Sequence, residues 1–206
     1  MEAISVAAAA VGALLPITNP VGALALYAGL TGDYPEVEVR RQAVRTAGYV
    51  FGILAVFALV GSLLLAAFGI SLAALQIAGG LVVGHAGFVA LVARTDLRRS
   101  EQGHAEVKQD VSFSPMALPM VAGPGAIGVV IALTAQHPHW GARIGVVVAC
   151  AIIAVLVGVL LRFGTPFVDR LGPTEIGALV RILGFLILAI GVELVLHGLH
   201  AAHVVR

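Results

Sequence analysis

Six long apolar stretches constrain the fold of this chain more than any other feature of its sequence. Each stretch has more than 20 residues, and a helix needs about 20 apolar residues to span a bilayer. The stretches are apolar all round, whereas the strands of a membrane β-barrel alternate apolar and polar residues. Hydrophobic residues make up 60% of the chain and charged residues only 11%, a balance that is untypical of soluble domains. We therefore predict an all-α integral membrane protein whose six transmembrane helices cover residues 3–30, 43–68, 70–93, 113–135, 142–163 and 178–200.

Basic residues are distributed unequally between the two sides of the predicted membrane domain. One side holds only Arg143 and Arg206, whereas the connectors after the first, third and fifth stretches hold nine basic residues with their flanks. Cytoplasmic loops carry the excess of Lys and Arg. We therefore predict a multi-pass protein of the inner or plasma membrane with both termini outside the cytoplasm. The nine residues are Arg40, Arg41, Arg45, Arg94, Arg98, Arg99, Lys108, Arg162 and Arg170.

The two halves of the chain share short sequence matches at nearly one offset. Asn19-Pro20 aligns with Gly123-Pro124 at an offset of 104 residues, and residues 75–83 align with residues 180–188 at an offset of 105. Each half holds three spans, so a duplication places the halves in the membrane with opposite orientation, as in many secondary transporters. We predict a single membrane domain, residues 1–206, built from two inverted three-helix repeats. The repeats are residues 1–94 and 113–206, and the cytoplasmic connector is residues 95–112.

Proline interrupts the first and the fourth predicted helix at matching positions. Proline lacks a backbone donor and clashes with the preceding turn, so a helix breaks there. In lipid, the freed backbone groups must face protein or a water-filled cavity. The second half of each broken helix then starts with exposed amides that suit a carboxylate. Plain proline kinks are the alternative, but the paired positions favour a substrate site formed by Asn19, Pro20, Val21, Gly22, Gly123, Pro124, Gly125 and Ala126.

Four polar side chains fall inside the predicted spans, and ionisable groups at membrane depth are usually functional or paired. With a rise of about 1.5 Å per residue, Gln76 and Glu193 each lie about 10 Å from the outer face of the membrane. Arg181 and His85 lie about 6 and 12 Å from the inner face. Gating or proton coupling is one hypothesis for this set. The alternatives are an ion pair of Glu193 with His197, snorkelling of Arg181 to the headgroups, and plain packing of His85. The set is Gln76, His85, Arg181 and Glu193.

The C-terminal histidines and the single cysteine give little indication of a metal. His197, His200 and His203 recur every three residues, a spacing that suits a metal on one helix face, but no carboxylate lies between them. An unliganded interfacial tail is the favoured interpretation. Cys150 is alone within an apolar stretch, so no disulfide framework or thiolate cluster is expected. We expect neither a metal site nor a cofactor.

Several motifs resemble the MarC family of bacterial and archaeal membrane proteins. They are ITNPVGAL, IAGGL, SPMALPMVAGPGAI and VRILGFLILAIGV, and the similarity covers nearly the whole chain. The resemblance implies a six-helix protein related to the LysE exporter superfamily, with members described as proton-coupled transporters of glycine or alanine. It also implies that the two broken motifs form the substrate region and that Arg181 is the arginine of the sixth span. Two positions depart from the family pattern, since Gln76 replaces an arginine and Glu193 a glutamine.

Together these features predict a secondary transporter of small metabolites. Small neutral, zwitterionic amino acids are the expected substrates, and proton coupling is one hypothesis. An exporter of another small metabolite is an alternative, and a structural or chaperone-like membrane protein is an alternative of another class. We expect no enzyme, because an HExxH pair and paired intramembrane aspartates are missing from the sequence. The partners are the lipid bilayer and the substrate. A net charge of +1 argues against nucleic acid, and a homo-oligomer is compatible with the sequence.

The charge asymmetry predicts the accessibility of cysteines placed in the connectors. We expect Arg98→Cys and Thr174→Cys to be shielded from a membrane-impermeant thiol reagent added to sealed cells, because both connectors are predicted to be cytoplasmic. Labelling should appear only after the membrane is permeabilised. Ready labelling of either cysteine in sealed cells would reverse the predicted topology.

Overall fold

The computed structural model describes residues 2–92, 110–137 and 139–202, and within these residues every regular element is helical. Four of the helices are long and apolar enough to cross a membrane alone. Two further pairs of shorter helices pass the same test as bent pairs, which gives up to six spans. The predicted all-α membrane fold is therefore confirmed.

Both predicted breaks are present. Helix α1 (Glu2–Ile17) meets α2 (Pro20–Thr31) at 47°, and η2 (Ser112–Val121), a wide helical segment, meets α6 (Pro124–Gln136) at 59°. In each pair the second helix begins with a proline, Pro20 in α2 and Pro124 in α6. The amide of a first helical residue has no partner within the helix, so proline loses no hydrogen bond there. The prolines of the fourth span also distort η2. Ser114 and Leu118 are extended there because each precedes a proline.

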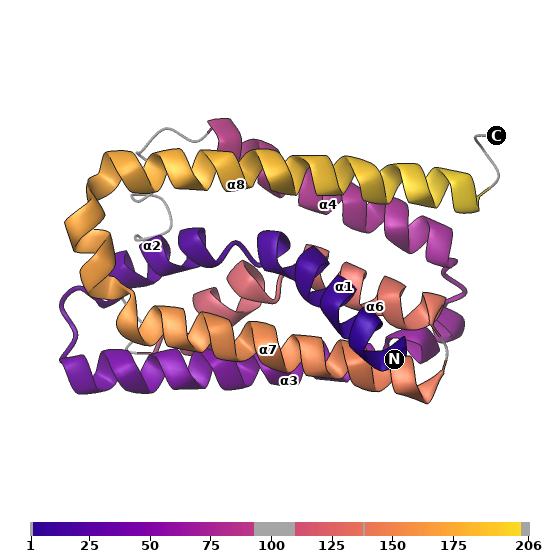
Figure 1. The fold of residues 1–206 in the computed structure, drawn as a ribbon, viewed down its shortest axis with the longest axis horizontal. Coiled ribbons are helices and arrows are strands. Elements are labelled where there is room, and N and C mark those ends of the chain that lie inside the picture. Colours follow the sequence, from indigo (N-terminus) through magenta and orange to yellow (C-terminus); the bar gives the residue numbers. More distant parts are fainter. Residues whose placement is uncertain (1, 93–109, 138, 203–206) are drawn as a thin grey trace.

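The broken helices lie between two pairs of long helices. Figure 1 shows α3 (Glu36–Phe68) beside α7 (Trp140–Phe163) along one side of the molecule and α4 (Leu72–Val92) beside α8 (Thr165–Ala201) along the other. Each broken span touches both pairs: α1 contacts α7 and α8, α2 contacts α7 and α8, and α6 contacts α3 and α4. We call the two pairs the α3–α7 layer and the α4–α8 layer. The breaks are thus enclosed by protein on two sides.

The contacts within this arrangement have matching counterparts in the two halves of the chain. α4 packs on α8 and α3 on α7, while α2 contacts α8 and α6 contacts α4. Two repeats related by a two-fold axis would give such a pattern. The inverted repeat stays a prediction that the helix pairing fits.

The long helices reach further into the predicted connectors than the apolar stretches do. α3 already begins at Glu36, and the exposed Glu36 carboxylate pairs one turn later with Arg40, a spacing that supports a helix. α8 begins at Thr165 and continues past Gly172, whose positive φ of 78° bends it. The connector predicted for residues 95–112 lies outside the described residues up to residue 109.

The hydrophobic core is built by the α3–α7 layer and the broken helices. Its largest fully buried apolar side chains include residues of α1, α2, α3, η2, α6 and α7, and no residue of α4 belongs to it. Large apolar side chains on the outer faces are exposed, as expected of helices that face lipid. The largest buried core side chains include Leu14, Tyr27, Leu54, Met116, Ile153 and Leu161.

Glycines, by contrast, hold the α4–α8 layer together. A Cβ atom added at Gly191 would lie 2.4 Å from the backbone nitrogen of Gly84, and one added at Gly87 would lie 2.3 Å from that of Leu188. Near the other end of the pair, a Cβ at Gly198 would lie 2.9 Å from the Ala73 carbonyl oxygen. The two backbones therefore run antiparallel in direct contact, which small residues permit in membrane helices.

This packing predicts opposite effects for two glycine-to-alanine substitutions. Gly191→Ala should destabilise the fold by about 1–3 kcal/mol, because its methyl group meets rigid backbone. Gly52→Ala in α3 meets no atom within 4 Å, so it should be neutral or stabilise by up to about 1 kcal/mol. Unfolding of the purified protein by SDS titration measures both. Equal midpoints for the two variants would contradict the proposed backbone contact.

Candidate functional site

At the first break, Asn19 caps the N-terminus of α2. Asn19 adopts the left-handed conformation, with φ 42° and ψ 62°, which few residues other than glycine tolerate as well as asparagine does. Its side-chain oxygen accepts a hydrogen bond from the Gly22 amide at 3.1 Å, and its carbonyl accepts one from Ala23 at 2.9 Å. Pro20 is buried and has no amide proton. Of the amides in the first turn of α2, that of Val21 therefore takes no part in the hydrogen bonds to Asn19.

The second break has no such cap. Gly123 is extended, with φ −71° and ψ 174°, and no side chain caps α6. A Cβ atom at Gly123 would lie 2.4 Å from the Pro119 carbonyl oxygen, so this close turn of the chain requires glycine. The first backbone hydrogen bond of α6 runs from the Ile127 amide to the Gly123 carbonyl at 3.0 Å. The amides of Gly125 and Ala126 precede it, at the positive end of the helix dipole.

The two breaks are therefore chemically unequal, although the sequence predicted unpaired amides at both. At the first break this expectation is wrong for Gly22, because the Asn19 side chain occupies its amide. At the second break, Gly125 and Ala126 are buried, and a buried amide needs a partner. An anionic group therefore has more donors available at the start of α6 than at the start of α2.

The start of α6 lies beside the end of α1 and under α4. A Cβ atom at Gly125 would lie 3.6 Å from Cγ2 of Ile17, the last residue of α1, and 2.4 Å from Cγ2 of Val83 in α4. The negative end of the α1 dipole thus adjoins the positive end of the α6 dipole. One turn further along, Gly79 of α4 faces Gly128 of α6, with an added Cβ 3.6 Å from the opposite Cα.

The four polar residues predicted within the spans are not gathered at the breaks. His85, Arg181 and Glu193 are exposed on the outer faces of α4 and α8. The Glu193 carboxylate lies 3.3 Å from Nε2 of His197, which confirms the local contact considered from the sequence.

Gln76 alone of these four is buried, at 5% exposure, and its Oε1 atom has no hydrogen-bond partner. It shares the buried face of α4 with Val83, seven residues and therefore about 10 Å further along the axis. An unpaired buried acceptor is costly, so Gln76 is a polar group that this arrangement of the helices leaves unsatisfied.

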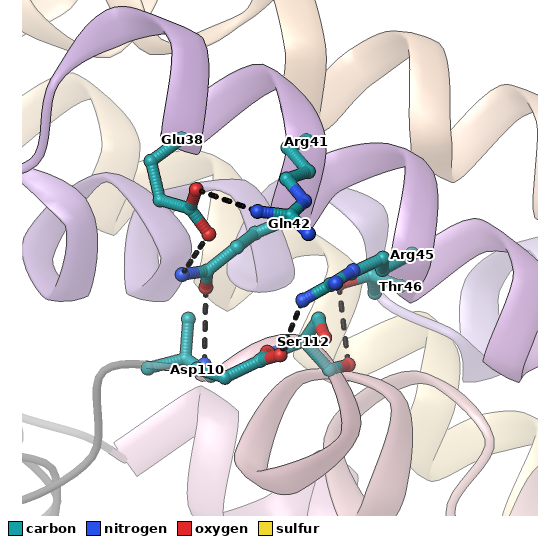
Figure 2. Close-up of polar contacts among 8 residues, drawn as sticks. Glu38, Arg41, Gln42, Arg45, Thr46, Asp110 and Ser112 are labelled. Atoms are coloured by element: carbon teal, nitrogen blue, oxygen red, sulfur yellow. Dashed lines mark hydrogen bonds and ion pairs between the residues drawn. The ribbon is translucent and has the colours of Figure 1, made fainter.

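A polar network that the sequence did not reveal joins α3 to the start of η2 (Figure 2). The fully buried Gln42 accepts a hydrogen bond from the Val111 amide at 3.0 Å, and the Thr46 hydroxyl donates to the Ser112 carbonyl at 3.2 Å. Gln42 also donates to Glu38 at 3.3 Å. This network fixes the chain where it enters the fourth span.

Asp110 completes the network. It accepts hydrogen bonds from the Ser112 hydroxyl and amide, and Arg45 donates to it at 2.8 Å. The Ser112 hydroxyl and the Arg45 guanidinium hold the pKa of the Asp110 carboxyl below its ordinary value. The four-residue spacing of the polar Gln42 and Thr46 was the available signal, since α3 buries the face that they share. Their partners near residue 110 are distant in sequence and could not be inferred.

Three pockets lie away from the breaks. A pocket of about 450 Å³ is lined by Tyr34, Pro35, Glu38 and Arg41, beside the polar network. Two apolar pockets of about 750 and 570 Å³ lie on the outer face of α7 and between α1 and α7. None of these three includes a residue of either break, and the apolar pair is open to lipid.

The conformation of Asn19 makes substitutions there informative. Asn19→Ala loses the cap and places alanine at positive φ, so it should destabilise the fold by about 2 kcal/mol. Asn19→Gly loses only the cap and should cost less than about 1 kcal/mol. SDS-induced unfolding measures the two losses. Equal losses would show that the left-handed backbone contributes nothing.

The comparisons with known proteins agree with this architecture. A model described as "MarC family integral membrane protein" matches residues 4–203. The chain is 34% identical over 199 residues to the inner membrane protein MarC of Escherichia coli O1:K1. It is 33% and 32% identical over 198 residues to the proteins of that name from Citrobacter koseri and Salmonella typhimurium, and each alignment covers 90% of both chains. No solved structure matches the chain. The predicted resemblance is confirmed, and the chain belongs to the MarC family of integral membrane proteins.

Proposed function

We propose that this protein is a secondary transporter, and not an enzyme, which binds small neutral amino acids at the second break. The observation that carries the proposal is the meeting of two helix ends of opposite polarity inside the protein. α6 begins with the amides of Gly125 and Ala126, which no side chain caps, and α1 ends at Ile17 beside Gly125. Broken helices enclosed between packed helices are the usual site of substrate in transporters with inverted repeats.

The charges of a zwitterion fit these two ends. The amides at the start of α6 suit the carboxylate, since a helix N-terminus binds anions without a basic side chain. The carbonyl end of α1 suits the ammonium group, because it carries the negative end of the helix dipole. Arg181 is exposed on α8, so this mode of binding does not depend on it.

The space around Gly125 favours a small substrate. Val83 and Ile17 approach the position of its missing side chain, and Ala126 is buried beside it. A large side chain on the ligand would have to displace these groups from a close-packed interior. Glycine, alanine and serine should therefore bind better than leucine or phenylalanine.

The exposure of His85, Arg181 and Glu193 makes each of them a weaker candidate for proton coupling than the sequence indicated. Proton coupling by Glu193, Arg181 or His85 remains a hypothesis, and the Glu193–His197 contact supports an interfacial pair instead. Gln76 is the one residue of this set on the buried face of α4, so it is the better candidate for a gating role.

Thermal stabilisation of the purified protein by defined ligands tests the proposed site. Alanine should raise the melting temperature, whereas propionate and ethylamine at the same concentration should not, because each lacks one of the two charges. Gly125→Ala should weaken the response to alanine at least tenfold, or by about 1.4 kcal/mol. Uptake of labelled alanine into proteoliposomes, with and without a pH gradient, should follow the same order.

Two controls separate binding from packing. Gly141→Ala adds a methyl group that meets no atom within 4 Å, so it should bind alanine as the wild type does. Val83→Ala in the Gly125→Ala background removes the group that the new methyl would contact and should restore stability without restoring binding. Equal stabilisation by propionate and alanine, or an unchanged response of Gly125→Ala, would refute the site.

A further inference from the structure

The α4–α8 layer differs from the rest of the molecule in the way it is held. Within the layer, the backbones are in direct contact at the glycines Gly84, Gly87 and Gly191. The polar side-chain contacts described for residues 177–201 of α8 stay inside that helix, Glu193 with His197 and His200 with the Leu196 carbonyl. The two helices of the layer therefore pack closely on each other, and neither of these two polar contacts attaches residues 177–201 to a neighbouring helix.

The remaining helices form a second unit with its own core. The α3–α7 layer and the broken helices contribute almost all of the buried apolar cluster. The Gln42 and Asp110 network further ties α3 to η2 (Figure 2). Packed interiors of this kind resist continuous deformation, so this unit should keep its shape while other parts of the protein move.

Two contacts of α4 with α6 cover the second break. Gly79 of α4 faces Gly128 of α6 with no side chain between them, and Val83 of α4 occupies the space over Gly125. Gln76, on the same face of α4, is buried with an unpaired Oε1 atom. A displacement of α4 would uncover Gly125 and would also let water reach Gln76.

Each link between the units that the structure describes contains a glycine at positive φ. Gly69 joins α3 to α4 with φ 65°, and Gly172 lies between α7 and the part of α8 that packs on α4, with φ 78° and ψ 167°. The backbone conformation of Gly172 is one that almost only glycine adopts. Hinges are a few positions at the ends of elements that absorb a change in φ and ψ.

We propose that α4 and residues 177–201 of α8 move together as one rigid body against the other helices, with Gly69 and Gly172 as hinges. This motion rests on the proposed function, for which it supplies the step that opens and closes the site at Gly125. The structure described here is the closed arrangement, in which Val83 covers Gly125. Figure 1 shows the moving pair, α4 and α8, as the outer layer beside the broken helices.

Distances between spin labels test the motion without any ligand. In a Cys150→Ala background, labels at Phe88→Cys and Ile152→Cys report the separation of α4 from α7, and labels at Phe88→Cys and Ile182→Cys report that of α4 from α8. All three positions are exposed, so labelling should not disturb the fold. In lipid nanodiscs, the α4–α7 pair should give two separated distance peaks and the α4–α8 pair a single narrow one.

A matched pair of glycine substitutions tests the hinge. Gly172→Ala should change the ratio of the two α4–α7 peaks about tenfold, because alanine disfavours the backbone conformation found here. Gly177→Ala, which meets no atom within 4 Å, should leave the ratio unchanged. A single narrow α4–α7 peak, or an α4–α8 distribution as broad as that of α4–α7, would overturn the proposal. Two α4–α7 peaks in a protein that binds no amino acid would refute the proposed function and leave the motion standing.

Discussion

The need to satisfy backbone hydrogen bonds in lipid governs this fold. A continuous helix meets that need alone, but Pro20 and Pro124 prevent two of the six spans from being continuous. The freed groups must then be enclosed by protein, and the two layers of long helices provide the enclosure on either side of the broken spans (Figure 1). The central position of the breaks is thus a consequence of their backbone chemistry.

The backbone groups freed at the two breaks are satisfied in different ways. Asn19 tolerates the left-handed conformation and uses its own side chain as a cap, so the first break is largely self-sufficient. Gly123 permits a close turn but has no side chain to donate or accept, which leaves the amides of Gly125 and Ala126 for another partner. The two proline breaks, at matching positions in the two halves of the chain, thus differ in how their first-turn amides are satisfied.

The sequence predicted what depends on local chemistry. The six spans follow from the apolar stretches, and the breaks follow from proline, which acts on its own helix. It did not predict which way side chains point, because helices that are apolar all round have no polar stripe that defines an outer face. The sequence therefore offered His85 and Glu193 as candidates for gating or proton coupling, although both are exposed. The contacts of Gln42 with Val111 and of Arg45 with Asp110 join residues more than 60 positions apart, and no local pattern encodes them.

Glycine has two consequences in the α4–α8 layer, and both follow from the solvent. Lipid is as apolar as leucine, so helices gain little by hiding apolar side chains from it and associate instead through close van der Waals contact. Gly80, Gly87 and Gly191 allow that contact within the pair, which makes the pair rigid. On the surface toward α6, by contrast, no side chain separates Gly79 from Gly128, and Val83 fills the space over Gly125. Glycine thus joins α4 and α8 by direct backbone contact, whereas α4 meets α6 through one glycine pair and through Val83, a side chain that a movement of α4 could withdraw from Gly125.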